Sequence, residues 1–203
     1  MKLDYQQIVA NYGVKSRDQL NSVFMDEIAY TWVDMYKENG YGLYGEITSQ
    51  RFHDFSFVFD FTERSLSDDI IASNLPDSRV VGVYGMSHTK VDLGNRKMMR
   101  KYLGKSSQAF KHFGEHYDKG HFIAHYSGGP IDINLFPQKR EVNRGWSIEG
   151  KKYRAMEKYA AANPGTFIFS RPIYKDFSCC PYEIEFGYCD ADFSFVVDVF
   201  PNK

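Results

Sequence analysis

Long apolar runs are missing from this chain of 203 residues. No stretch approaches the roughly 20 apolar residues that a membrane-spanning helix needs, so we expect no membrane association. The first seven residues, Met1 to Gln7, also lack the apolar centre of an ordinary secretory signal. The sequence therefore predicts a cytoplasmic protein, or one that is exported as an effector without a cleaved signal peptide.

Cysteine is also scarce, since the chain has only Cys179, Cys180 and Cys189. Three cysteines cannot form the disulfide framework of a small secreted domain, and a reducing compartment is the simpler expectation. They include no Cys-x-x-Cys pair of the kind that zinc sites use. A zinc-stabilised structural domain is a minor alternative, because two pairs of histidines are spaced four residues apart: His112 with His116, and His121 with His125.

A large net charge is absent too, because the formal charge is −1. A hydrophobic content of 43% and an aromatic content of 17% exclude the class of disordered chains. The length suits one domain with a substantial core, and no internal repeat or linker divides it. We expect residues 1–203 to form a single domain, in which residues 1–75 carry no recognised motif and residues 79–203 hold the functional core.

The small total charge hides a segregation along the chain. Residues 1–78 carry a net charge of −7, residues 79–158 carry +9 and residues 159–203 carry −3. Five of the six histidines also fall in the middle segment. A basic middle segment suits an anionic partner such as a nucleic acid backbone. The alternative is a solvated basic face that pairs with the acidic flanks, and charge alone does not separate the two.

Hydrophobic periodicity predicts the first elements. Ser16 and Gln19 resemble a capping box, and apolar residues at helical spacing predict a helix over residues 17–38. Alternating phenylalanines predict a strand over residues 52–61 with one side facing solvent. Residues 79–86 predict a second strand.

The second half of the chain mixes element types as well. Residues 122–125 are apolar enough for the end of a strand, and residues 151–162 are typical of a helix. Two further strands are expected over residues 167–169 and 193–199. Helices and strands in this mixed order predict an α+β fold.

The chemistry-bearing residues gather between Asp118 and Arg144. Hydrolysis of a phosphodiester needs a base that deprotonates water, and a neutral histidine such as His121 can do this near pH 7. It also needs positive charge on the transition state and the leaving oxygen, which a bound Mg²⁺ supplies. Mg²⁺ prefers oxygen ligands and keeps several waters, so the Asn143 amide oxygen is a candidate ligand. Candidate phosphate-binding residues are Lys119, Arg140 and Arg144, and Asn134 is a candidate for positioning the loop or a metal-bound water.

Four segments in this order resemble the DNA/RNA non-specific endonuclease family, whose members carry the His-Me finger, also called the ββα-metal motif. The family pattern is an Asp-Arg-Gly-His turn, an Asn-x-x-Pro-Gln segment, an asparagine at the head of a helix and a glutamate further along it. The matching segments are Asp118-Lys119-Gly120-His121, Asn134-Leu135-Phe136-Pro137-Gln138, Asn143-Arg144-Gly145 and Tyr153-Arg154-Ala155-Met156-Glu157.

The resemblance implies a mainly antiparallel central sheet with helices at its sides and a ββα-metal finger on one face. It implies that His121 is the general base, that Asn143 is the direct protein ligand of Mg²⁺, with Mn²⁺ as an alternative metal, and that Glu157 holds a metal-bound water. Two departures stand out. Lys119 replaces the usual arginine, which is not a neutral change at a phosphate clamp. The interval from Asn143 to Glu157 is longer than usual, so Glu149 is the alternative carboxylate.

The first hypothesis is therefore a metal-dependent nuclease that cuts DNA, with RNA as a second candidate substrate and with little sequence preference, similar to bacterial toxin-like members of the family. A toxin of this kind would require an immunity or inhibitor protein in the cell that makes it. The second hypothesis is a non-catalytic module on a degenerate nuclease fold that binds nucleic acid or protein, and Lys119 is the residue that favours it.

Overall fold

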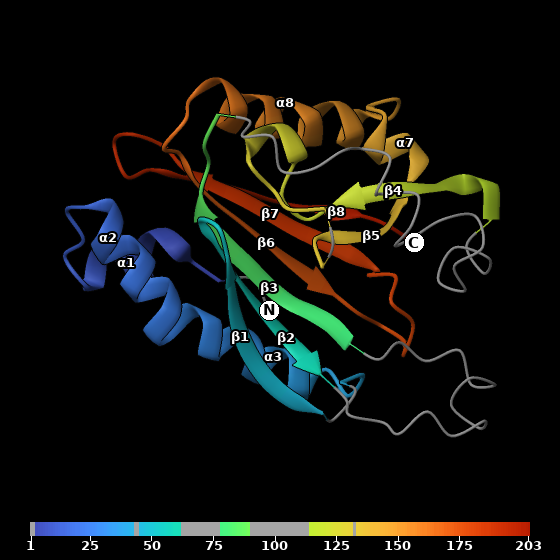
Figure 1. Cartoon of the computed structure of the whole chain (residues 1–203), viewed down its shortest axis with the longest axis horizontal. Coiled ribbons are helices and arrows are strands. Elements are labelled where there is room, and N and C mark those ends of the chain that lie inside the picture. The colour runs from blue at the N-terminus through green and yellow to red at the C-terminus, as the bar shows by residue number, and fades with distance from the viewer. Residues whose placement is uncertain (1–2, 43–44, 62–77, 90–113, 132) are drawn as a thin grey trace.

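The computed structural model describes residues 3–42, 45–61, 78–89, 114–131 and 133–203 (Figure 1). Its main sheet has six strands in the order β1-β2-β3-β6-β7-β8, and each neighbouring pair is antiparallel. The strands are β1 (Glu46–Phe52), β2 (Phe55–Phe61), β3 (Ser78–Met86), β6 (Phe167–Ile173), β7 (Glu183–Cys189) and β8 (Phe195–Pro201). A second sheet pairs β4 (Tyr117–His121) with β5 (Leu135–Lys139). The expected mixed fold with a mainly antiparallel sheet is confirmed.

Helices cover both faces of the main sheet (Figure 1). One face carries α1 (Tyr5–Asn11), α2 (Arg17–Val23), the π-helix η1 (Phe24–Ile28) and α3 (Ala29–Glu38). The other face carries the β4–β5 hairpin, α7 (Arg140–Asn143) and α8 (Ile148–Ala162). Two short 3-10 turns, η2 (Gly114–His116) and η3 (His125–Ser127), flank β4. No helix within the described ranges is long and apolar enough to cross a membrane.

The first helical region begins where the sequence predicts. The Ser16 side chain accepts a hydrogen bond from the Gln19 backbone N–H at 3.2 Å. The Gln19 side chain accepts from the backbone N–H of Lys15 at 2.7 Å, one residue before the cap, so the box is displaced by one position. Helical geometry then continues through α2, η1 and α3, which confirms the helix predicted over residues 17–38.

The strand predicted over residues 52–61 is wrong in two respects. A hairpin turn at His53, whose φ is +54°, divides the segment between β1 and β2. The side of β2 expected to face solvent is buried, because α1 to α3 cover it. Val58 lies in the helical core, and the Asp60 carboxylate is 1% exposed. The Asp60 oxygens accept hydrogen bonds from the Tyr36 hydroxyl at 3.0 Å and the Gly45 N–H at 2.8 Å, which compensate its burial.

Alternate side chains of β2 thus pack into two separate hydrophobic cores, one on each face of the sheet. Phe55, Phe57 and Phe59 pack on the α8 side of the sheet, against residues of α8 and the hairpin such as Tyr153 and Phe136. These rings support the hairpin from below. The sheet is therefore the platform that positions β4, β5 and α7.

Candidate active site

The β4–β5 hairpin carries the Asp-Lys-Gly-His segment. Asp118 lies opposite Gln138, and His121 lies opposite Leu135. A Cβ added at Gly120 would come within 2.3 Å of the Gln138 Cβ, so only glycine allows the two strands to approach here. Side chains alternate along a strand, so Lys119 and His121 project from one face of β4 while Asp118 projects from the other.

The predicted strand end over residues 122–125 is displaced, because β4 ends at His121 and the next residues form the start of a loop. Asn134 organises that loop. Its amide oxygen accepts from the Ile123 N–H at 2.8 Å, and its amide nitrogen donates to the carbonyls of Ile123 at 2.7 Å and Pro130 at 2.8 Å. Asn134 is 0% exposed. The sequence suggested that Asn134 positions either the loop or a metal-bound water, and these contacts support the first role.

Asp118 is the hub of the site. Arg144 donates from Nε to Asp118 Oδ2 at 2.6 Å and from Nη2 to Oδ1 at 3.1 Å. Arg140 donates from Nε to Oδ1 at 3.2 Å, and Asn143 donates from Nδ2 to Oδ2 at 3.3 Å. One carboxylate of β4 therefore binds three side chains of α7 and its C-terminal end. Sequence analysis places Asp118 in the Asp-Lys-Gly-His segment but predicts no role for it.

The electrostatics of this hub are those of a permanent anion. Burial alone would raise the pKa of the Asp118 carboxyl, but hydrogen bonds from Arg144, Asn143 and Arg140 outweigh burial and lower that pKa below its ordinary value. Asp118 is then ionised at neutral pH. Two guanidinium groups face this one carboxylate, so the cluster keeps a net positive charge that suits a phosphate.

The amide of Asn143 is oriented by its bond to Asp118. Nitrogen and oxygen are the two branches of one planar group, so fixing the nitrogen on Asp118 turns the oxygen away from that carboxylate. The amide oxygen is the atom that a metal would use. A single hard oxygen donor of this kind fits Mg²⁺, which keeps several of its waters when protein ligands are few. Asn143 is half-buried, which leaves it accessible.

His121 lies at the end of β4 and is half-buried. The hydroxyl of Tyr153, in α8, donates to the His121 carbonyl at 3.3 Å and ties the strand end to the helix. The ring of His125 lies 6.3 Å from the ring of His121, centroid to centroid. His125 itself is 8% exposed, and its Nδ1 lies 3.3 Å from the Gly129 carbonyl oxygen. His125 therefore lies in the loop next to His121, the candidate base.

The two candidate carboxylates sit differently on α8. Glu149 is exposed in the first turn. Glu157 is half-buried, and its Oε2 accepts from the Tyr126 hydroxyl at 3.2 Å, across to η3. Burial raises the pKa of Glu157 to about 7, against lowering by the Tyr126 hydrogen bond and the charge of Arg154. Glu157 is the carboxylate that reaches toward the loop after His121.

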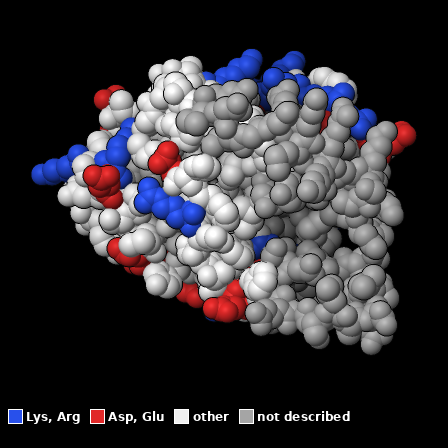
Figure 2. Space-filling view, in the orientation of Figure 1, with Lys and Arg blue, Asp and Glu red and all other residues white. Residues whose placement is uncertain are grey.

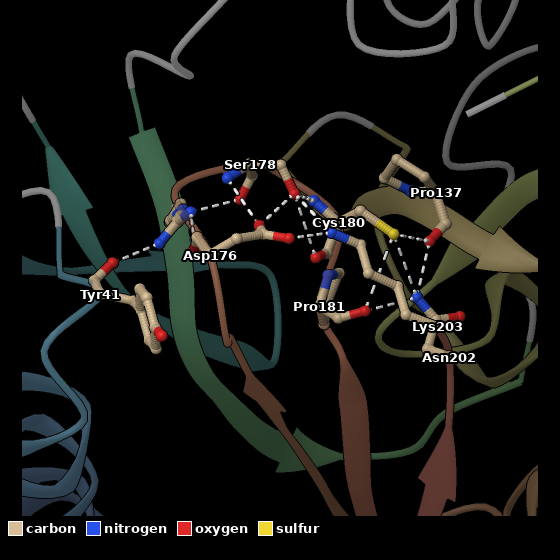
Figure 3. Close-up of polar contacts among 9 residues, drawn as sticks. Tyr41, Pro137, Asp176, Ser178, Cys180, Pro181, Asn202 and Lys203 are labelled. Atoms are coloured by element: carbon tan, nitrogen blue, oxygen red, sulfur yellow. Dashed lines mark hydrogen bonds and ion pairs between the residues drawn. The ribbon is translucent and has the colours of Figure 1, made fainter. Parts of the chain in front are cut away.

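The hairpin is anchored on its far side by Asn202 (Figure 3). The Asn202 amide nitrogen donates to the carbonyls of Pro137 at 2.9 Å and Pro181 at 2.8 Å, while its oxygen accepts from the Lys139 N–H at 2.8 Å. Pro137 and Lys139 belong to β5, which leads directly into α7. Asn202 is 1% exposed. The sequence contains no signal for this anchor, because its partners in the hairpin, Pro137 and Lys139, lie 65 and 63 residues away.

The zinc alternative gains no site within the described ranges. No group of three or more His, Cys, Asp and Glu side chains there is placed to hold a metal ion. His112 lies outside the described residues. Burial raises the pKa of the Cys180 thiol to about 12, which disfavours the thiolate that zinc would need.

The structure thus brings Arg140, Asn143 and Arg144 together on Asp118. Lys119 and His121 share the opposite face of the same strand. Glu157 lies farther along α8 and binds Tyr126 of η3. The sequence analysis did not identify Tyr126 as part of the site.

Comparisons with known proteins find a similarity among solved structures. No family model matches the chain, and no curated protein matches it. Among solved structures, the chain is similar to a structure of Sda1 nuclease with a bound zinc ion, at 17% identity and a TM-score of 0.37. The similarity covers 84% of this chain and 66% of that chain, just under two thirds of its length. The roles proposed below rest on this chain's own residues and contacts.

Proposed function

We propose that the chain is a metal-dependent endonuclease that hydrolyses phosphodiester bonds of DNA, with RNA as a second candidate substrate. The observation that carries this proposal is the attachment of Asn143, Arg140 and Arg144 to Asp118. Lys119 and His121 lie on the other face of the same strand, so the proposal places the phosphodiester at the end of β4, where His121 is the last residue of the strand. A base, an oxygen donor for a metal and several cations are all needed at a phosphodiester. The β4, β5 and α7 segments would then act as the ββα-metal finger.

In this proposal the side chains have separate roles. His121 accepts the proton of the attacking water, which a neutral imidazole can do near pH 7. Arg140, Arg144 and Lys119 bind phosphate oxygens, and Asp118 holds the two arginines in a fixed orientation. Asn134 holds the loop behind His121.

A divalent cation, Mg²⁺ or Mn²⁺, would be held by the Asn143 oxygen and, when bound, supplies the positive charge that stabilises the transition state and the departing oxygen. Glu157 would position a water at that cation. Low sequence preference follows because every cation named here is suited to phosphates, and phosphate contacts carry no direct sequence information.

The test is cleavage of supercoiled plasmid by purified protein, with Mg²⁺, with Mn²⁺ and with chelator. We expect nicking that requires the metal. His121→Ala is expected to lower the rate by about 10²- to 10⁴-fold, the range for loss of a general base. His125→Ala is the matched control, because it removes the neighbouring histidine. The proposal fails if the wild type is inert with both metals on DNA and RNA, or if His121→Ala cuts as fast as the wild type.

A further inference from the structure

One flank of α8 carries a line of cations. Lys151, Arg154 and Lys158 are spaced three and four residues apart, so they lie on one side of the helix. Lys151 and Lys158 are exposed, and Arg154 is half-buried. The exposed neighbours on this side, Ala155 and Ala162, are small. We call this the α8 flank, and its shape leaves a large polyanion free to approach the three cations.

Two contacts fix the orientation of α8 about its axis. Glu157 follows Arg154 by three residues and binds Tyr126 of η3, so this side of the helix turns toward the loop after His121. Lys152 lies on the other side and forms an ion pair with Asp198 of β8. The Glu157 side of the helix therefore faces the loop after His121, and the Lys152 side faces β8. Lys151 and Lys158 lie between these two sides, opposite the buried Tyr153 and Ala160, and face solvent.

The α8 flank is continuous with the Asp118 cluster. Arg154 Nη1 donates to the backbone carbonyl of Arg144 at 3.2 Å, and the Arg144 side chain is 46% exposed. Figure 2 shows Lys and Arg side chains gathered along the edge of the molecule where α7 and α8 lie in Figure 1. Arg144 thus joins the three cations of α8 to the site.

The dimensions suit a nucleic acid backbone. The rise of about 1.5 Å per residue places Lys158 roughly 10 Å beyond Lys151 along the helix. A strand of duplex DNA advances about 3.4 Å per phosphate, so this length corresponds to about three phosphates. The α8 flank itself, in residues 151, 154, 155, 158 and 162, has no aromatic side chain on which an unpaired base would stack.

We propose that the α8 flank binds the phosphate backbone of double-stranded nucleic acid beside the bond that is cut. The inference rests on the proposed function, since it assigns the path of the substrate leading to that same site. Contacts to the backbone alone predict equal affinity for different sequences and a strong dependence on salt.

Binding is measured by the fluorescence anisotropy of a labelled DNA duplex of about two helical turns, in chelator so that no cleavage occurs. The double variant Lys151→Gln, Lys158→Gln is compared with the wild type and with Lys152→Gln. We expect the double variant to bind roughly tenfold more weakly and to lower the slope of log affinity against log salt by about two. Lys152→Gln should match the wild type, because its charge faces Asp198.

The inference is overturned if the double variant keeps the affinity and salt slope of the wild type, or if Lys152→Gln loses as much. A single strand of the same length that binds more tightly than the duplex would also overturn it. Cleavage is assayed in parallel, where we expect a raised KM with kcat unchanged. If binding follows the prediction and no metal supports cleavage, the proposed function fails while the surface stands. If the double variant cuts with the wild-type KM, the surface alone fails.

Discussion

The two faces of the main sheet each hold an arginine–carboxylate cluster, and the clusters differ in what they can reach. On the helical face, Arg171 Nε donates to Glu185 Oε2 at 2.6 Å, and the two side chains are 8% and 0% exposed. On the hairpin face, Asp118 binds Arg140 and Arg144, whose side chains are 34% and 46% exposed. The first cluster is buried, whereas the second presents its cations to solvent.

The buried cluster belongs to an aromatic core. The Tyr5 hydroxyl donates to Glu185 at 2.7 Å and accepts from the Trp32 indole N–H at 3.0 Å. Burial and the Glu185 charge raise the pKa of Tyr5 well above its ordinary value. Such a network specifies how α1 and α3 dock on the sheet. The comparison therefore separates residues that maintain the fold from residues that we propose to contact a substrate.

The largest expected effect on stability comes from breaking the buried cluster. Glu185→Ala leaves the Arg171 guanidinium buried without its carboxylate, which costs about 3–5 kcal/mol in the free energy of unfolding. Urea unfolding followed by tryptophan fluorescence measures it. Glu183→Ala is the control on the same strand, because its ion pair with Lys175 spans 3.9 Å and is partly exposed. That variant should lose no more than about 1 kcal/mol. Equal losses in the two variants would remove the distinction between the clusters.

A smaller effect concerns pH on the hairpin face. The pKa of Glu157 is about 7 in the fold against an ordinary value of 4.5, so between these values the folded chain binds a proton that the unfolded chain does not. The contribution of Glu157 to stability therefore falls as pH rises through this window. Glu157→Gln stays neutral and should lack this decline, so urea unfolding at pH 5 and pH 8 should favour the variant more at pH 8. Parallel pH profiles for variant and wild type would contradict the raised pKa.

Part of this architecture is readable from the sequence. The helix over residues 17–38 and α8 follow from apolar periodicity, and β3 follows from a run of β-branched residues. The strands β1, β5 and β7 were not predicted. β1 is an edge strand with mostly exposed or half-buried residues, so its sequence has no apolar alternation. β5 contains Pro137 at its centre, a residue that sequence patterns place outside strands.

The site shows the same division. The spacing of His121 and Asn143 predicted a common site from local motifs. The role of Asp118 could not be predicted, because its partners lie 22 to 26 residues away and meet it only when α7 packs on β4. The burial of the β2 face that carries Asp60 could not be predicted for the same reason. The sequence of β2 alone does not indicate that helices cover both faces of the sheet.

In the proposed site, Asp118 orients the groups that would perform the chemistry. The direct test is the rate of Mg²⁺-dependent plasmid nicking by Asp118→Asn, measured well below its melting temperature and beside the wild type. The amide keeps the size of the side chain but loses the charge that holds Arg140, Asn143 and Arg144. We predict a loss of about 10- to 100-fold, the range for residues that orient a metal ligand, with a higher Mg²⁺ requirement. Nicking at the wild-type rate and the wild-type Mg²⁺ requirement would contradict this orienting role of Asp118.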